Sequence, residues 1–388
     1  MRVLHLGKYY PPALGGIELH VQALAQGQAA LGADVTVIAV NHDRGGSDAT
    51  YRAFTRTRTR EERDGPVRVI RVGRVASIAQ KLSVTPRLPL LLRRYGREAD
   101  LIHLHCRNPT MSAGLRAIGR LPAPLVITHH SDVARQRVLR RALLALEGPL
   151  YARAARILAT SPAYAQASDV LQGHMERVRA LPLGIDLAPF SEPSSAALAE
   201  AASLRARYEG PLWLMVGRLV YYKGHEVALE ALRGLPGTLI VIGTGPLAGS
   251  LWESAQRLGL SKRVVFLGEV EESVLQGAYQ AATALWFPSL ARSEGFGLVQ
   301  VEAMASGIPV VNTTIPGSGV HWVCPHEVCG LTVPSVDPEA FRAAVQRILD
   351  EPELGPALGA AGRLRARESF SRERMARTSL EHYREVLA

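Results

Sequence analysis

The sequence predicts an α/β protein made of two open, doubly wound parallel sheets, and three observations support this class. Short apolar segments rich in branched residues alternate with segments of helical period along almost the whole chain. The alternation stops once, at the Pro-, Ser- and Gly-containing stretch 182–196, and then restarts. A length of 388 residues fits two domains of ordinary size. We therefore expect one domain over residues 1–185 and a second over residues 186–371.

The first domain is expected to contain six buried parallel strands, because six of its segments are short, apolar and rich in branched side chains. Before the second of these strands, residues 17–33 carry apolar side chains at intervals of three and four, which predicts a helix. The domain is therefore expected to be a Rossmann-like unit. The six segments are VLHLG (3–7), VTVIAV (35–40), VRVIRV (67–72), LIHLH (101–105), PLVITHH (124–130) and ILATS (157–161).

The second domain repeats this pattern, with helical segments between five expected strands. A last helix is expected over residues 372–388, after the second domain. The chain thus predicts two Rossmann-like domains in series, without short internal repeats or low-complexity tracts. The five segments are LWLMVG (212–217), TLIVIG (238–243), RVVFLG (263–268), ALWFPS (284–289) and IPVVNT (308–313).

Composition indicates a globular protein of a reducing compartment. Hydrophobic residues make up 47% of the chain, enough for ordinary buried cores. The opening MRVLHLGKYYPP lacks the apolar core and cleavage site of a signal peptide, and no stretch reaches the roughly 18 to 20 apolar residues of a membrane helix. Three cysteines are too few for a disulfide scaffold. We expect a cytoplasmic protein that can attach peripherally to the inner face of the cell membrane.

Positive charge is concentrated in the first half of the chain. Residues 1–200 carry 27 Lys and Arg against 16 Asp and Glu, whereas residues 201–388 carry 18 against 19. The excess is densest over residues 51–97, where the apolar run LPLLL is followed by basic residues, and this suits an anionic membrane surface. An ordinary solvated arginine face is the alternative. Nucleic acid fits less well, since base-stacking aromatics and a binding motif are missing. The basic residues of this segment include Arg52, Arg56, Arg58, Arg60, Arg63, Arg68, Arg71, Arg74, Lys81, Arg87, Arg93, Arg94 and Arg97.

Two glutamates near residue 300 are the most informative candidates for chemistry. Seven residues separate Glu294 from Glu302 in the stretch SEGFGLVQVEAMASGIPVV. Apolar residues recur at helical spacing after a Gly-rich turn, so Glu294 is expected at the mouth of a helix and Glu302 two turns inside it. Both carboxylates can then bind sugar hydroxyls of one ligand, while the amides at the helix start offer a seat for phosphate oxygens. A helix cap at Glu294 and a solvated Glu302 are the alternative interpretation.

The pattern resembles the E-x7-E element of retaining glycosyltransferases, family 4 in particular, which take a sugar from a nucleotide diphosphate. Other segments are similar to elements of that family in the same order, so the resemblance covers almost the whole chain. It implies the GT-B fold, in which two Rossmann-like domains face a central cleft and the last helix crosses back to the first domain. The segments are YYPPALGGIE (9–18), GRLVYYKGHEVALEAL (217–232), GTGPL (243–247) and FLGEV (266–270).

The resemblance also implies roles for the residues at strand ends. In the first, acceptor-binding domain, a histidine after a strand contacts the donor hexose, and His130 matches it better than His129. Asp132 would orient His130 or bind acceptor hydroxyls. Gly15 and Gly16 would let the backbone approach a ligand closely, with Glu18 beside them at the start of the first helix. A plain turn and a structural histidine are the alternatives.

In the second, donor-binding domain, the resemblance implies a site for the nucleotide diphosphate. Arg218 and Lys223 would neutralise the diphosphate and stabilise it as it leaves. These cations would replace a metal, and no Asp-x-Asp motif stands at a strand end, so no metal or other cofactor is expected. Glu294 would hold the transferred sugar and Glu302 the ribose. The remaining expected contacts are the phosphate-binding backbone of Gly295, Phe296, Gly297, Leu298 and Val299, the backbone of Val270 beside the base, and Gly243.

The resulting expectation is a metal-independent hexosyltransferase that uses a UDP- or GDP-linked donor and acts with retention on a hydroxyl acceptor, in particular a lipid-linked polysaccharide or glycolipid precursor. An epimerase or hydrolase of nucleotide sugars on the same architecture remains an alternative. GTGPLA followed by Glu269 imitates a dinucleotide fingerprint, but Pro246 stands where a helix should begin. HWVCPHEVC (321–329) contains metal-binding residue types, yet it lacks a second ligand pair at zinc spacing. A membrane-bound binding protein with a decayed site is disfavoured by the intact charged residues.

Overall fold

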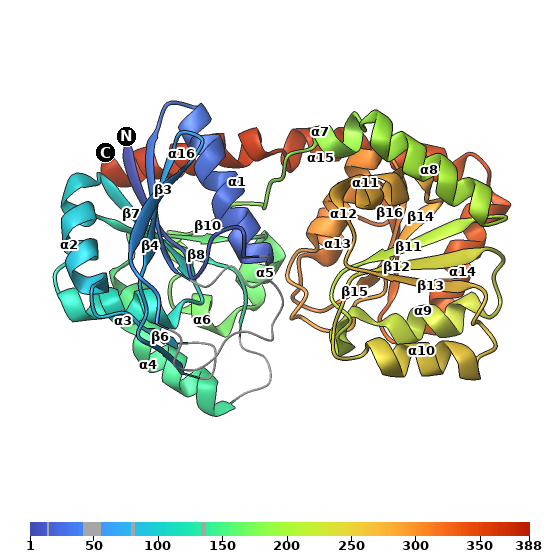
Figure 1. Cartoon of the computed structure of the whole chain (residues 1–388), viewed down its shortest axis with the longest axis horizontal. Coiled ribbons are helices and arrows are strands. Elements are labelled where there is room, and N and C mark those ends of the chain that lie inside the picture. Colours follow the sequence, from blue (N-terminus) through green and yellow to red (C-terminus); the bar gives the residue numbers. More distant parts are fainter. Residues whose placement is uncertain (14, 42–55, 79–81, 133–136) are drawn as a thin grey trace. The chain divides into compact units, whose positions relative to one another are not determined.

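The computed structural model describes residues 1–388 except 14, 42–55, 79–81 and 133–136, and it divides into two compact units (Figure 1). Unit 1 comprises residues 1–185 and 372–388, and unit 2 comprises residues 186–371. Each unit is a twisted, largely parallel sheet with helices on both faces, which confirms the α/β class that the sequence predicts.

Unit 1 is built on an eight-stranded sheet in which seven strands run parallel. The strand that departs from this is the outermost one, which pairs antiparallel to its neighbour. Two short strands form a separate hairpin, β5 (Ala76–Ile78) and β6 (Leu82–Val84). The order across the large sheet is β10 (Val178–Ala180), β9 (Arg156–Ala159), β8 (Leu125–His129), β7 (Leu101–Cys106), β1 (Arg2–Leu6), β2 (Asp34–Val40), β4 (Val67–Val72) and β3 (Arg60–Asp64).

Helices cover both faces of this sheet because successive side chains of each strand point to opposite faces. Val3 packs in one core cluster with residues of the first and last helices of the unit. Its neighbour Leu4 packs in another cluster with residues of the second and third helices. The helices of unit 1 are α1 (Gly16–Ala30), α2 (Leu88–Glu98), α3 (Pro109–Ile118), α4 (Arg137–Arg153), α5 (Pro162–Ala167), α6 (Asp169–Gln172), the 3-10 turn η2 (Met175–Arg177) and α16 (Arg372–Leu387).

Unit 2 has a six-stranded, fully parallel sheet. Its order is β13 (Val264–Gly268), β12 (Thr238–Ile242), β11 (Leu212–Val216), β14 (Ala284–Phe287), β15 (Val310–Thr314) and β16 (Gly330–Pro334). The helices are α7 (Ala188–Ser191), α8 (Ser195–Arg207), the 3-10 turn η3 (Tyr221–Lys223), α9 (His225–Leu232), α10 (Ala248–Arg257), α11 (Glu272–Ala281), α12 (Leu298–Ser306), α13 (Val320–Val323), α14 (Pro338–Asp350) and α15 (Leu354–Ser369).

Several strands are absent from the sequence-based prediction, and each has a physical reason. β3 has the sequence REERD, and a charged strand is stable only at an edge, where one side of its ladder faces solvent. β10, at the other edge of the unit 1 sheet, spans only three residues. β16, at an edge of the unit 2 sheet, ends in proline. Apolar patterning detects central strands, so these edge strands and the β5–β6 hairpin escaped it. Among the described helices, none combines the length and apolarity needed to cross a membrane.

Candidate active site

The order of the strands in unit 2 marks where a ligand binds. Strand order runs outward in one direction from β11 to β13 and in the other from β14 to β16, so the reversal lies between the paired strands β11 and β14. Open α/β sheets bind ligands at the carboxyl ends of the strands beside such a reversal. Lys223 follows β11 and Glu294 follows β14. The fold therefore brings these two sequence-predicted residues to one place.

Lys223 and Glu294 form an ion pair with the ammonium Nζ 2.6 Å from carboxylate Oε2. Their side chains are 13% and 11% exposed, so the pair is largely withdrawn from solvent. The ammonium also lies 5.0 Å from the centre of the Phe287 ring, a cation–π contact. The hydroxyl of Ser289 donates to the same carboxylate oxygen at 3.5 Å. These contacts fix both charges in the structure without a ligand.

Helix α12 begins at Leu298, four residues after Glu294, and its start depends on glycine. Gly297 precedes the helix with φ of 79°, a left-handed conformation that favours glycine. A Cβ atom there would also lie 2.7 Å from a Phe287 ring carbon. The backbone from Gly295 to Val299 thus forms the amino end of a helix, whose dipole and N–H groups attract anions.

Helix α12 starts at Leu298, the residue at which the apolar helical spacing begins after the Gly-rich turn. Glu302 is the fifth residue of the helix and lies in its second turn, so it is less deep in the helix than the two turns expected. Its carboxylate Oε2 accepts a hydrogen bond of 2.6 Å from the hydroxyl of Tyr279 on α11. Burial raises the pKa of the Glu302 carboxyl, while Tyr279 and the more distant Lys223 oppose that rise. The pair Tyr279–Glu302 was not predicted, because nothing in the spacing of the two residues indicates a contact.

The remaining predicted residues of unit 2 surround the same strand ends. Arg218 follows β11 and is exposed. Gly243 follows β12, and a Cβ atom there would collide with the carbonyl of Gly217, so glycine is needed for this close backbone approach. Val270 follows β13 by two residues and is half-buried. A pocket of about 300 Å³ opens here, lined by Leu219, Gly243, Thr244, Gly245, Ala248, Trp252, Phe266 and Gly268.

In unit 1 the order of strands reverses between β1 and β7, and the first predicted group lies in the loop after β1. A Cβ atom at Gly15 would collide with the carboxylate of Glu18, so these two residues are close neighbours. Gly16 starts α1 and has no protein atom within 4 Å of an added Cβ among the described residues. Burial raises the pKa of the Glu18 carboxyl, and the charge of Lys8 opposes this.

His130 and Asp132 follow β8, but they do not contact each other as predicted. The carboxylate Oδ1 of Asp132 lies 3.2 Å from Nε2 of His129 and accepts from Arg107 at 3.3 Å. The expectation that Asp132 orients His130 is therefore not met, because the Asp132 carboxylate contacts the ring of His129 instead. Strand alternation would place residues 130 and 132 on one face, but β8 ends at His129 and the alternation does not extend beyond it. His129 is fully buried, with Nδ1 2.7 Å from the Tyr151 hydroxyl.

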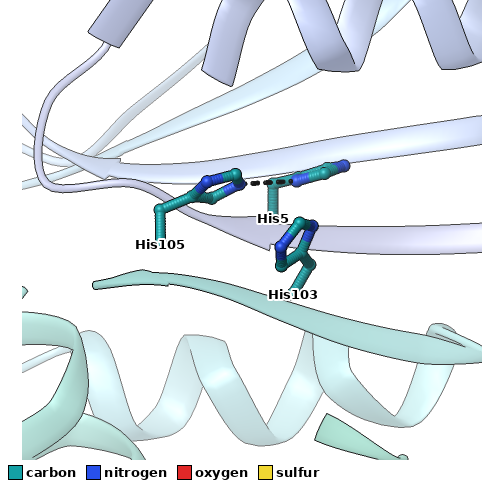
Figure 2. Close-up of side chains that lie close together, drawn as sticks. All are labelled: His5, His103 and His105. Atoms are coloured by element: carbon teal, nitrogen blue, oxygen red, sulfur yellow. Dashed lines mark hydrogen bonds between the residues drawn. The ribbon is translucent and has the colours of Figure 1, made fainter. Parts of the chain in front are cut away.

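His130 belongs instead to a cluster of buried histidines that the sequence interpretation missed. Nδ1 of His105 lies 3.3 Å from Nε2 of His130. Nε2 of the same ring lies 3.0 Å from Nδ1 of His5, and Figure 2 shows this contact with His103 beside it. Strand alternation could have indicated that these histidines share one face of the sheet, because residues an even number of positions apart in a strand point to the same face. His5 follows Val3 by two residues and His105 follows Leu101 by four, and Val3 and Leu101 lie on the face covered by α1 and α16. The cluster comprises His5, His20, His103, His105 and His130.

Two triplets of these imidazoles have spacings compatible with a metal ion. In each, one nitrogen per ring lies within 4.8 Å of the others, and the triplets are His5, His103, His105 and His20, His105, His130. Hydrogen bonds to neighbouring residues already engage the nitrogens of the first triplet. Burial lowers the pKa of every imidazole in the cluster, with values of about 4 for His5 and about 3 for His20. Burial therefore favours the neutral form of each ring.

The basic segment of unit 1 is less accessible than its composition indicates. Arg71 and Arg74 are 2% and 1% exposed, and Arg71 donates to the backbone carbonyls of Tyr10 and Pro11. These two arginines cannot face a membrane, which corrects that part of the prediction. Arg52 and Lys81 lie outside the described residues. Helix α2 retains an exposed surface made of Leu90, Arg93, Arg94 and Arg97.

Known families match both halves of the chain. A model described as Glycosyltransferase Family 4 matches residues 14–189, and one described as Glycosyl transferases group 1 matches residues 199–365. The chain is 32% identical to D-rhamnosyltransferase WbpZ of Pseudomonas aeruginosa over 96% of this chain and 92% of that protein. It is 28% identical to O-antigen chain mannosyltransferase C of Escherichia coli, over 97% and 96% of the two chains.

Solved structures show the same fold. Sucrose-phosphate synthase from Thermosynechococcus elongatus superposes with a TM-score of 0.76 and 26% identity, over 99% of this chain and 98% of that one. Anabaena HepE in complex with UDP-glucose gives a TM-score of 0.77 at 18% identity, over 99% and 100% of the two chains. Both likenesses extend over unit 1 and unit 2, so the GT-B fold is confirmed for the whole chain.

Proposed function

This chain belongs to the group 1 glycosyl transferases, and we propose on that premise that it moves a hexose from a UDP- or GDP-linked donor to a hydroxyl acceptor with retention of the anomeric configuration. It is an enzyme of the transferase class, as its relatives WbpZ and O-antigen chain mannosyltransferase C are. The observation that supports the proposal best is the ion pair of Lys223 and Glu294 at the amino end of α12, beside the strand reversal of unit 2.

The donor is proposed to bind in unit 2. Its diphosphate would lie against the backbone amides of residues 295–299, where the helix dipole favours negative charge. Lys223 and Arg218 would add two cations to the same group. Glu302 would accept hydrogen bonds from the ribose, and the base would enter the pocket of about 300 Å³ beside Gly243, close to the backbone of Val270. Its lining of glycines, Phe266 and Trp252 suits a flat ring.

The chemistry proposed for this site relies on fixed charges. The bond between the anomeric carbon and the leaving phosphate oxygen breaks, and the acceptor oxygen bonds to that carbon on the same face. The acceptor hydroxyl proton passes to the leaving phosphate oxygen. Lys223 would stabilise the charge that develops on the phosphate, and its contact with Glu294 holds it in place beforehand. Glu294 would hold the hydroxyls of the transferred sugar, and the two cations would make a metal unnecessary.

The acceptor is proposed to bind in unit 1, near Gly15, Gly16 and Glu18. The open space beside Gly16 gives room for a ligand. His130 would contact a hydroxyl of the donor hexose, and the half-buried Asp132 would bind acceptor hydroxyls beyond the bonds it makes to His129 and Arg107. The relative named O-antigen chain mannosyltransferase C supports an acceptor that belongs to a polysaccharide chain, and we propose that this acceptor is lipid-linked.

A lipid-linked acceptor also gives a role to the exposed surface of α2. Leu90 is 69% exposed, and Arg93, Arg94 and Arg97 lie in the following turns of the same helix. We propose that this surface docks reversibly on an anionic membrane, where each basic side chain contributes about 1 kcal/mol that salt screens. Among the residues that the structure describes, Arg94 forms a loose ion pair of 3.8 Å with Glu98, and Arg93 and Arg97 form none.

Sedimentation with liposomes tests this docking. The protein should pellet with vesicles containing anionic lipid, lose binding at high salt, and lose it when Arg93, Arg94 and Arg97 become Glu. A matched variant with Arg207, Arg257 and Arg367 changed to Glu carries the same net charge, and these exposed arginines belong to unit 2. Equal binding of the two variants would refute a role for α2, and no binding to anionic vesicles at low salt would refute membrane docking altogether.

A panel of UDP and GDP sugars tests the transferase proposal. Release of nucleoside diphosphate that depends on an added lipid-linked or saccharide acceptor, with the sugar recovered on that acceptor, is the expected result. Release without acceptor, or recovery of an isomerised donor, would instead show the hydrolase or epimerase that the same architecture can support. Product analysis with and without acceptor separates the three outcomes.

A further inference from the structure

The histidine cluster of unit 1 contains a line of hydrogen bonds whose direction can be worked out from its first member. The line begins at Ser379 on α16, whose hydroxyl donates its single proton to the carbonyl oxygen of Ala376 at 2.7 Å. Ser379 Oγ can therefore only accept from Gln28 of α1, 2.7 Å away, so the amide nitrogen of Gln28 must face it. The same nitrogen donates to the hydroxyl of Tyr383 at 3.1 Å.

The amide oxygen of Gln28 consequently faces His5, with Oε1 2.8 Å from Nε2. Because a carbonyl oxygen only accepts, His5 must carry its proton on Nε2, and its Nδ1 keeps a lone pair. That lone pair accepts from Nε2–H of His105 at 3.0 Å. Nδ1 of His105 is then an acceptor as well, and it receives Nε2–H of His130 at 3.3 Å. Each ring thus repeats the tautomer of the one before it.

Burial keeps this line neutral, and exposure is greatest at its His130 end. Desolvation lowers the pKa of His5, His105 and His130, so none carries a second proton near neutral pH. His5 and His105 are 0% and 1% exposed, whereas His130 is 8% exposed. With its proton on Nε2, His130 has an Nδ1 lone pair that can accept a hydrogen bond from a hydroxyl group.

We propose that Gln28, oriented by Ser379 of α16, is a positioning residue that fixes His130 in the Nε2–H tautomer through His5 and His105, and thereby presents Nδ1 of His130 to a substrate hydroxyl. The part that concerns substrate rests on the function proposed above. Through this line of hydrogen bonds, Ser379 of α16 influences the tautomer of His130, which directly follows β8 and is far from α16 in sequence. It also explains why a polar glutamine lies fully buried between α1 and α16.

Nitrogen NMR of the protein labelled with 15N-histidine measures the tautomer directly, without any donor, so its result stands even if no transferase activity is found. The signal of His130 is assigned by its loss in His130→Ala. We expect the Nε2–H form in the unmodified protein and a mixture of both tautomers in Gln28→Leu, where neither direction of the line is favoured. If Gln28→Leu does not fold, Ser379→Ala serves instead, because it removes the acceptor that orients the amide.

Thr128→Val is the matched control. Thr128 accepts from Nε2 of His103 at 2.7 Å, and His103 is bonded through Nδ1 to Tyr383, a side branch that does not pass through His105. The control loses a buried hydrogen bond of the same cluster but should keep the tautomer of His130. Turnover of Gln28→Leu is expected to fall about threefold to tenfold, the effect of one neutral hydrogen bond, and that of Thr128→Val to change less.

Three results would overturn the proposal. The Nδ1–H form of His130 in the unmodified protein contradicts the direction of the line. An unchanged tautomer in folded Gln28→Leu and Ser379→Ala shows that Gln28 does not set it. A changed tautomer with unchanged turnover shows that Nδ1 of His130 does not meet the substrate. Failure of every donor to react would count against the proposed function alone.

Discussion

Replacing Lys223 with alanine is expected to lower turnover about a hundredfold while the fold survives. The ammonium is fixed 2.6 Å from Glu294 and over the ring of Phe287, at the amino end of α12 where the diphosphate is proposed to leave. Removing one preorganised electrostatic contact of this kind typically lowers the rate by two to three powers of ten, or about 2.7–4 kcal/mol. Initial rates of nucleoside diphosphate release, with the best donor at saturation, measure the change.

The same substitution leaves Glu294 without its cation, and the resulting stability loss must be separated from the catalytic one. Both side chains are about nine-tenths buried, so breaking the pair should destabilise the protein by about 3 kcal/mol. The double variant Lys223→Met with Glu294→Gln removes both charges. It should recover most of that stability, because no unpaired charge remains, yet its turnover should stay at least as low as that of Lys223→Ala.

An exposed pair in the same unit provides the control. Arg233 and Glu230 lie 3.2 Å apart with side chains 60% and 44% exposed, so Arg233→Ala should change stability by no more than about 0.5 kcal/mol and turnover not at all. Denaturant unfolding and circular dichroism monitor the fold of each variant. Near-normal turnover in a folded Lys223→Ala protein would refute its role at the leaving group, as would recovery of turnover in the double variant.

Three further predictions concern the donor site, metal dependence and pH. Tyr279→Phe removes the 2.6 Å hydrogen bond to Glu302 and should raise the KM for donor about threefold to tenfold, because the carboxylate that is proposed to bind the ribose is then no longer held in position. An unchanged KM would show that Glu302 does not bind the donor. EDTA should leave initial rates intact, because Arg218 and Lys223 supply the positive charge; loss of activity that magnesium or manganese restores would contradict this. The free energy of unfolding should fall when the pH is lowered from about 7 to about 5, because histidines of the unfolded chain bind protons below about pH 6.5 while the folded cluster does not, burial lowering the pKa of His5 to about 4. Each such histidine contributes up to about 1.4 kcal/mol per pH unit. Equal unfolding midpoints at both pH values would contradict neutral imidazoles in the folded protein.

Much of the architecture follows from local sequence patterns. Central parallel strands are buried on both faces, so β11 and β12 read as nearly continuous apolar runs, and the sequence pattern predicts them for that reason. β1 and β7 follow the same pattern apart from their buried histidines. The pattern did not predict β3, because a strand at a sheet edge can form its backbone hydrogen bonds with charged side chains and without an apolar sequence. Edge strands depend on a neighbouring strand to pair with, which no local pattern reports.

The candidate site was predictable where the chain itself fixes the geometry. Glu294 and the start of α12 are neighbours in sequence, and Lys223 follows the adjacent strand, so their convergence follows from strand order. The contacts of His130 with His105 and of Asp132 with Arg107 were not predictable, because β7 and the residues after it are about 25 positions away in the sequence. Alternation along β1 and β7 does place His5 and His105 on one face, but only the packing of α1 and α16 on that face reveals Gln28 as the partner of His5.

The stereochemistry of the transfer tests the central claim most directly. Proton NMR of a reaction with an α-linked nucleotide sugar and a saccharide or lipid-linked acceptor reports the anomeric configuration of the first product. We predict an α-linked product that forms together with nucleoside diphosphate, in equal amounts, only when acceptor is present, and whose formation is nearly abolished by Lys223→Ala and by Glu294→Ala. A β-linked product, or diphosphate release that proceeds equally without acceptor, would contradict the assignment of a retaining glycosyltransferase.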